Sequence, residues 1–353
     1  MGSAKQKTDI RKEIMLYRIQ FIFISFVLIF FCSNELFATI SGFICKDWHE
    51  IDVDQKQEIE STSNSMLEML LSNEGNKLWN LTHPATQKAI TKPAYITSVE
   101  NVHNRLSGIN NAKLADGRLI SVVGHKSSPG QVICGSVDQN SPEHLRIVTF
   151  PSMKKIVATI TEIPSQPIGR VVSLMMAEHN SRLKLVHFMI TSRSYHGKLA
   201  EYYEKIANNW ISKGEIISGY LAYAMDYRLN YLGPNIQTGK FINARERLTN
   251  LLKDKELKNS LKSWTLPDGK YQIFGIDLIE TLNDISPRVR YLSMKKLGAD
   301  TTPIEATALM TYFKEKCPEL GKEFDAVLFE AYSEIPSDPN KNYQTYRVPL
   351  SFN

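Results

Sequence analysis

The sequence KIVATITEIPSQPIGRVVSLMMAEHNSRLKLVHFMIT, residues 155–191, consists of three segments rich in β-branched and other apolar residues, separated by two short turn signals. The turn signals are Pro164–Pro167 and Glu178–Ser181, and Pro, Asn and Ser are typical turn residues. The segments predict three strands, over Lys155–Ile163, Ile168–Ala177 and Arg182–Thr191. Because parallel strands need a crossover of about a dozen residues or more, connections this short predict an antiparallel meander.

The same pattern extends toward the amino terminus. Three more strands are predicted, over Arg118–Val123, Gln131–Val137 and Leu145–Phe150. Ser128-Pro129-Gly130 is a turn signal between the first two. Residues 118–191 are therefore expected to form a single meander of antiparallel strands.

Helices are predicted before this meander. Ile59, Met66 and Leu70 recur at helical spacing, and the apolar run ends at Asn73-Glu74-Gly75, which is a plausible carboxyl-terminal cap. Two further helices are predicted, over residues 76–83 and 94–106. Helices followed by a run of strands place the chain in the α+β class.

This order of helices and meander resembles the cone-shaped fold of the nuclear-transport-factor and ketosteroid-isomerase group, over residues 52–192. The resemblance is architectural, since the sequence carries no catalytic motif of that group. It implies a curved sheet that wraps a long helix around a hydrophobic pocket, in a fold used by enzymes and by non-catalytic binding modules. Under this resemblance Trp79, Tyr95 and His187 are the candidate pocket residues.

Residues 198–261 are predicted to be helical again. Tyr203, Ala207 and Trp210 lie on one apolar stripe, and a second stripe follows the break at Ser212-Lys213-Gly214. The two helices are similar to one tetratricopeptide helix pair, although one copy is too few for a repeat array. An ordinary helical hairpin packed against the sheet domain is the alternative.

The last segment, residues 268–353, is predicted to be a small antiparallel α+β domain. Thr302-Pro303-Ile304-Glu305 is a capping box with proline at the first helical position, and the helix is expected to end near Cys317. The expected strands are Lys270–Glu280, Arg288–Met294, Ala326–Tyr332 and Tyr343–Leu350. We expect the helix to lie on one face of this sheet.

The amino terminus, residues 1–38, has the pattern of a membrane-targeting leader. A basic flank precedes the apolar run Ile19–Cys32. At 1.5 Å per residue this run reaches about 21 Å, which is short of a hydrocarbon core of about 30 Å, so a signal peptide cleaved after Ala38 is favoured over a retained signal anchor. Either alternative places the rest of the chain outside the cytoplasm, in the periplasm or secreted. Membrane contact through residues 19–32 is expected only if the leader is retained.

Three cysteines remain after the leader, so one disulfide at most can form within the chain. Cys45 and Cys134 are the favoured pair, because Cys317 lies far along the chain on a predicted helix face. No CxxC or HExxH motif is present. We therefore expect neither a metal site nor a cofactor.

Composition and motifs narrow the function classes. The formal charge of +5 comes from 42 basic and 37 acidic residues spread along the chain, which argues against a nucleic-acid partner. GxSxG, GxxxxGK[ST] and GxGxxG motifs are missing. The favoured interpretation is a non-catalytic binding or scaffolding protein of the cell envelope, with an envelope protein or a small apolar ligand as partner. The alternative is a small-molecule-binding or isomerase-like enzyme that uses the cone pocket, with His187 as its base.

Overall fold

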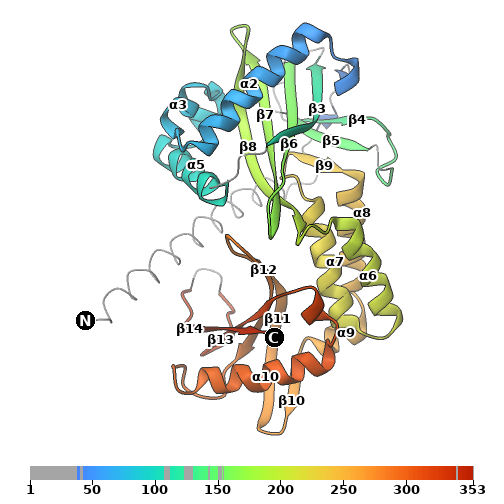
Figure 1. Ribbon diagram of the computed structural model, residues 1–353, viewed down its shortest axis with the longest axis vertical. Coiled ribbons are helices and arrows are strands. Elements are labelled where there is room, and N and C mark those ends of the chain that lie inside the picture. The colour runs from blue at the N-terminus through green and yellow to red at the C-terminus, as the bar shows by residue number, and fades with distance from the viewer. Residues whose placement is uncertain are drawn as a thin grey trace, which may run out of the picture.

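The computed structural model describes residues 38–39, 43–106, 112–122, 130–141, 144–149, 153, 155–338 and 341–352. Within them, helices combine with largely antiparallel sheets, which confirms the α+β class (Figure 1). The leader predicted over residues 1–38 lies outside the described residues apart from Ala38. In the described ranges, no helix is both long enough and apolar enough to span a bilayer.

The first sheet is a five-stranded antiparallel sheet in the order β2-β3-β6-β7-β8. Its strands are β2 (Phe43–Asp47), β3 (Lys113–Val122), β6 (Lys155–Ile163), β7 (Ile168–His179) and β8 (Arg182–Tyr195). Strands β6, β7 and β8 lie where the meander pattern predicts them. The sheet also takes in β2, which precedes the expected domain start at residue 52.

Helices cover one face of this sheet (Figure 1). They are α2 (Val53–Leu71), α3 (Gly75–Asn80), α4 (Pro84–Ala89) and α5 (Lys92–Leu106), preceded by the short 3-10 helix η1 (Trp48–Glu50). Met66 and Leu70 of α2 are fully buried in one cluster with Val157 and Leu174 of the sheet. The helical spacing noted in the sequence therefore marks the face that packs on the strands.

A smaller sheet covers the opposite face. It has the order β1-β4-β5-β9, formed by β1 (Ala38–Thr39), β4 (Gly130–Cys134), β5 (Leu145–Thr149) and β9 (Ile236–Thr238). Val132 and Ile147 of this sheet pack against Ile156 and Met175 of the first sheet. The prediction of a single meander is therefore wrong for the two strands near 131–137 and 145–150, which pair with each other in a separate layer.

Both faces of the first sheet are thus covered by protein. Strand β7 is buried continuously from Ile168 to Ala177, which is typical of a strand with protein on both sides. We call this layered body, which consists of strands β1–β9 and helices α2–α5, the first unit.

The second sheet has the order β10-β11-β12-β13-β14. Its strands are β10 (Ser263–Leu266), β11 (Gly269–Glu280), β12 (Ile285–Leu292), β13 (Ala326–Tyr332) and β14 (Thr345–Ser351). The sheet is not purely antiparallel, which corrects the prediction. Strands β12 and β13 are parallel, because α10 (Thr302–Lys316) and the 3-10 helix η2 (Leu320–Lys322) form the crossover that a parallel pair requires.

The helical segment predicted over residues 198–261 packs against one face of this second sheet and shares an apolar core with it. It contains α6 (Ala200–Ser212), α7 (Ile216–Asn230), α8 (Gly239–Leu251) and α9 (Lys255–Ser260). Leu221 and Met225 of α7 share one cluster with Val289 and Phe329 of the sheet. We therefore treat α6–α10 and β10–β14 as one body, the second unit, although the sequence suggested two.

The chain also returns to the first unit between α7 and α8. Strand β9 pairs antiparallel with β5, with Ile147 opposite Ile236. The boundaries predicted at 192 and 198 therefore do not separate the units completely, since β8 extends to Tyr195 and β9 lies inside the helical segment.

Candidate functional site

The three candidate pocket residues do not line one pocket. Trp79 and Tyr95 are in contact on the helical face of the first sheet, with ring centroids 5.1 Å apart at 68°. Tyr95 is buried, and its hydroxyl accepts a hydrogen bond from Thr82 Oγ1 at 2.9 Å. Burial raises the pKa of Tyr95 to about 12, so the phenol stays neutral. These two rings fill the core between helices and sheet.

His187 lies on the opposite face of the same sheet. Its cross-strand partner is Met175, whose side chain is in the layer between the two sheets of the first unit, and cross-strand partners share a face. Because side chains alternate between faces, the sheet separates His187 from Tyr95. The register of the strands is not evident from the amino-acid pattern, so this separation could not be predicted.

The imidazole of His187 is partly buried. Its Nε2 atom is buried and has no hydrogen-bond partner among the described residues. Burial lowers the pKa of His187 to about 4, so the ring is neutral near pH 7. A general base must reach its substrate, yet the layer around this strand is occupied by core side chains such as Val171 and Val186. His187 and the two aromatic rings therefore do not form one site, and an isomerase-like activity with His187 as base stays a prediction.

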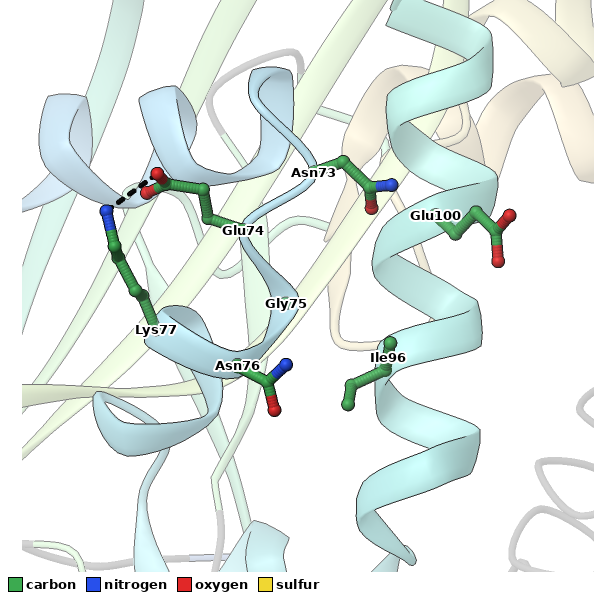
Figure 2. Close-up of a pocket in the computed structure, with 7 residues that line it drawn as sticks. All are labelled: Asn73, Glu74, Gly75, Asn76, Lys77, Ile96 and Glu100. Atoms are coloured by element: carbon green, nitrogen blue, oxygen red, sulfur yellow. Dashed lines mark hydrogen bonds and ion pairs between the residues drawn. The ribbon is translucent and has the colours of Figure 1, made fainter.

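A shallow depression of about 280 Å³ lies between the α2–α3 turn and α5 (Figure 2). It is lined by Asn73, Glu74, Gly75, Asn76, Lys77, Ile96 and Glu100. Its Glu74 and Lys77 side chains pair with each other at 2.7 Å, and Figure 2 shows this pair on the side away from α5. The depression is thus a surface hollow lined mostly by residues with polar side chains, and the candidate pocket residues are not part of it.

A disulfide joins Cys45 in β2 to Cys134 in β4, across 89 residues of sequence. This is the pair that the sequence analysis favoured. It ties the edge of the first sheet to the sheet that covers it. Cys317 is a free buried thiol, and burial raises its pKa to about 12, so it is not a ready nucleophile.

The second sheet presents a charged face opposite its helices. Alternate residues such as Val289, Tyr291 and Phe329 enter the core, and the intervening positions form what we call the open face. The open face comprises Gln272, Phe274, Asp277, Arg288, Arg290, Leu328, Glu330, Tyr332, Thr345, Arg347 and Pro349. Most of these side chains are partly or fully exposed, in contrast to both faces of the first sheet.

Ion pairs order the open face. Asp277 accepts hydrogen bonds from Arg288, through Nε at 2.8 Å and Nη2 at 2.9 Å, and from Arg290 Nη2 at 3.0 Å. Glu330 accepts from Arg347 Nε at 2.7 Å, and its side chain is only 2% exposed because its neighbours cover it. Three guanidinium groups and two carboxylates give the face a surplus of one positive charge.

A second cluster of charges lies where the two units meet. Glu280, at the end of β11, accepts hydrogen bonds from Ser192 Oγ at 2.7 Å and Arg228 Nη1 at 2.9 Å. Arg105 of α5 and Arg170 of β7 also donate to this carboxylate. Burial alone would raise the pKa of Glu280, but the three positive charges outweigh burial and lower it to about 2. We call these five residues the junction cluster.

Other polar contacts reinforce the junction. The hydroxyl of Tyr195 donates to Asp284 at 2.5 Å, and Lys198 pairs with Glu323 at 2.7 Å. The junction cluster was not predicted from the sequence, because its members are scattered over five elements, from Arg105 to Glu280. The open face did leave a local signal, since Arg288 and Arg290 alternate with apolar residues along one strand.

A different buried carboxylate lies within the second unit. Asp226 of α7 is 1% exposed and pairs with Arg247 Nη2 at 2.7 Å. Asn230 Nδ2 donates to the same carboxylate at 2.8 Å. Burial raises the pKa of Asp226 to about 6, because a single arginine offsets desolvation only in part.

No family model, curated protein or solved structure matches this chain. The resemblance to the cone-shaped group therefore stays a prediction.

Proposed function

We propose that the chain is an extracytoplasmic, non-catalytic binding or scaffolding protein of the cell envelope, and that the open face contacts its partner protein. The observation that carries this proposal is the contrast between the two sheets. The first sheet has protein on both faces, whereas the second packs helices on one face and leaves ordered charged and aromatic side chains on the other.

The composition of the open face suits a protein contact. Arginine and aromatic residues are enriched in the energetically important parts of interfaces. Phe274 and Tyr332 meet edge to face with centroids 5.0 Å apart, beside the arginine pairs. Because the guanidinium groups are already held by Asp277 and Glu330, little side-chain entropy remains to be lost on binding.

The proposed compartment rests on two further features. The leader pattern of residues 1–38 is typical of exported chains. The Cys45–Cys134 disulfide is the kind of bond that persists in oxidising compartments and is rare in the cytosol. Both support an envelope or secreted location.

Site-specific photocrosslinking in cells of the host tests the proposal. A photoreactive amino acid is placed at Gln272 or Thr345, two exposed positions of the open face, and at Thr311, an exposed position on α10 at the back of the same sheet. We expect one discrete adduct from both open-face positions, none from Thr311, and loss of the adduct with R290A. Amino-terminal sequencing of the protein from cell fractions tests the compartment in parallel.

Two results would contradict the proposal. One is the same adduct pattern from Thr311 as from Gln272 and Thr345, or no adduct from any of them. The other is recovery of the chain in the cytoplasm with its leader intact.

A further inference from the structure

The junction cluster holds more positive than negative charge. In the described part of the chain, Glu280 is the one carboxylate that pairs with Arg105, Arg170 and Arg228. Guanidinium groups remain protonated in proteins, so the cluster carries a surplus of two positive charges. This differs from the open face, where acidic and basic groups nearly balance.

Burial makes that surplus unfavourable. The Arg170 side chain is only 2% exposed. Burial is the main cause that lowers its pKa, Glu280 opposes this effect, and Arg105 and Arg228 add repulsion. Like charges repel more strongly in a protein interior than in water, so a further negative charge at this place would be stabilised.

The cluster is also partly exposed to solvent. The side chains of Arg105 and Arg228 are 24% and 30% exposed, so both are in part accessible from solution. Arg228 Nη2 donates to the carbonyl oxygen of Leu278 at 3.0 Å, and Arg170 Nη2 donates to that of Leu282 at 3.2 Å. These backbone contacts hold two of the arginines in place before any ligand arrives.

We propose that the solvent edge of the junction cluster binds a phosphate group, which bridges Arg105 and Arg228 beside Glu280. A phosphate dianion would match the surplus of two charges, and its oxygens accept charge-assisted hydrogen bonds from guanidinium groups. Each guanidinium has five N–H donors, and among the described residues Glu280 is the one acceptor found for Arg105. Because Arg105 is in the first unit and Arg228 in the second, the ligand would join the two.

The test is calorimetric titration of the purified full-length chain at constant ionic strength in chloride buffer. One arm uses inorganic phosphate and the other uses glycerol 3-phosphate, which distinguishes free phosphate from a phosphate monoester. We expect saturable binding of one phosphate group per chain in at least one arm. R105Q and R228Q should each weaken binding about tenfold or more, as charge-assisted contacts do. R182Q, at an exposed arginine elsewhere on β8, should bind like the wild type.

A second variant tests the charge argument. E280Q removes the competing carboxylate, so a folded E280Q chain should bind phosphate more tightly than the wild type. If E280Q does not fold, R105Q and R228Q decide the matter, with thermal melts to show that they remain folded. The proposal is overturned if neither arm shows saturable binding, or if the folded R105Q,R228Q double variant keeps wild-type affinity.

Discussion

Glu280 at the junction and Asp226 among the helices of the second unit are both buried carboxylates, yet their pKa values move in opposite directions. The pKa of Glu280 is lowered to about 2, and that of Asp226 is raised to about 6. Burial raises both, so the difference lies in the number of cations in contact: three arginines for Glu280 and one for Asp226. Burial alone therefore does not say whether a carboxylate stabilises the fold.

The two regions also differ in what holds them together. Asp226 lies beside an apolar core to which Leu221 and Met225 of the same helix contribute. At the junction, Ile168 and Tyr195 of the first unit also pack into this apolar core. The contacts of Glu280, Asp284 and Glu323 add hydrogen bonds and ion pairs. We therefore expect charge changes to loosen the junction far more than they loosen the helices.

The largest expected effect is that of E280A. It leaves three arginines without their carboxylate, one of them almost fully buried, and breaking a buried pair in this way costs about 3–5 kcal/mol. Urea unfolding followed by fluorescence and circular dichroism measures the free energy of unfolding. E319A removes a surface carboxylate that pairs with Lys322 and should cost far less than E280A. Equal losses for the two variants would refute the assignment of Glu280 as the central contact of the junction.

Removal of the disulfide comes next. The C45A,C134A double variant frees a loop of 89 residues in the unfolded chain, and we expect a loss of about 3–4 kcal/mol. The same denaturation experiment measures this loss in the free energy of unfolding. The control is C317A, which removes a buried thiol that is not part of a disulfide. Because both cysteines are in the first unit, the pH profiles described next should keep their slopes. A loss below about 1 kcal/mol would show that the bond contributes little.

The opposite pKa shifts predict opposite pH profiles. Glu280 binds protons less readily when folded, so its stabilising contribution is complete above its ordinary pKa of 4.5 and is lost as pH falls toward 2. Asp226 binds protons more readily when folded, so its contribution is greatest below 3.8 and declines as pH rises through 6. For shifts of this size each change is at most about 3 kcal/mol.

Unfolding free energies of the wild type, E280Q and D226N between pH 2 and pH 7 test these profiles. The advantage of the wild type over E280Q should grow from pH 2 to pH 4.5, and its advantage over D226N should shrink from pH 4 to pH 6. Taking differences between variants cancels other titrating groups, including His187. Slopes of the same sign would show that the three arginines do not outweigh burial at Glu280.

The smallest effect is expected at His187. H187L replaces a partly buried imidazole whose Nε2 is buried and has no described partner, so it should stabilise the fold by up to about 1 kcal/mol at pH 7. Thermal unfolding at pH 7 measures the change. A loss above about 2 kcal/mol would instead point to a partner that the imidazole needs.

The sequence predicted much of the fold because the relevant signals are local. Turn signals on either side of β7 marked both its ends within two residues, and the Thr302-Pro303 pattern marked the start of α10 within one residue. The predicted capping box does not form, because Thr301 is the N-cap residue and makes no capping hydrogen bond. The four strands expected in the second unit are present, although the short strand β10 was missed. Local patterns define elements well because they reflect the chain's own periodicity and turns.

Pairing between distant elements escaped prediction. Nothing local indicates that β4 and β5 leave the main sheet, or that β12 lies parallel to β13. The junction cluster is the extreme case, since Arg105 and Glu280 are 175 residues apart. The sequence does not show whether a charged side chain is exposed to solvent or is paired with three residues of opposite charge.

The pairing of β9 with β5 has a practical consequence for anyone who wishes to express part of this molecule. A truncation after residue 198 would remove Ile236 and Leu232 from the interior of the first unit and strip its outer layer of an edge strand. The remaining fragment would expose apolar surface and would therefore tend to aggregate. Shortened versions would have to retain the chain through Thr238, and with it α6 and α7, whose own packing surface is supplied by the carboxyl-terminal half.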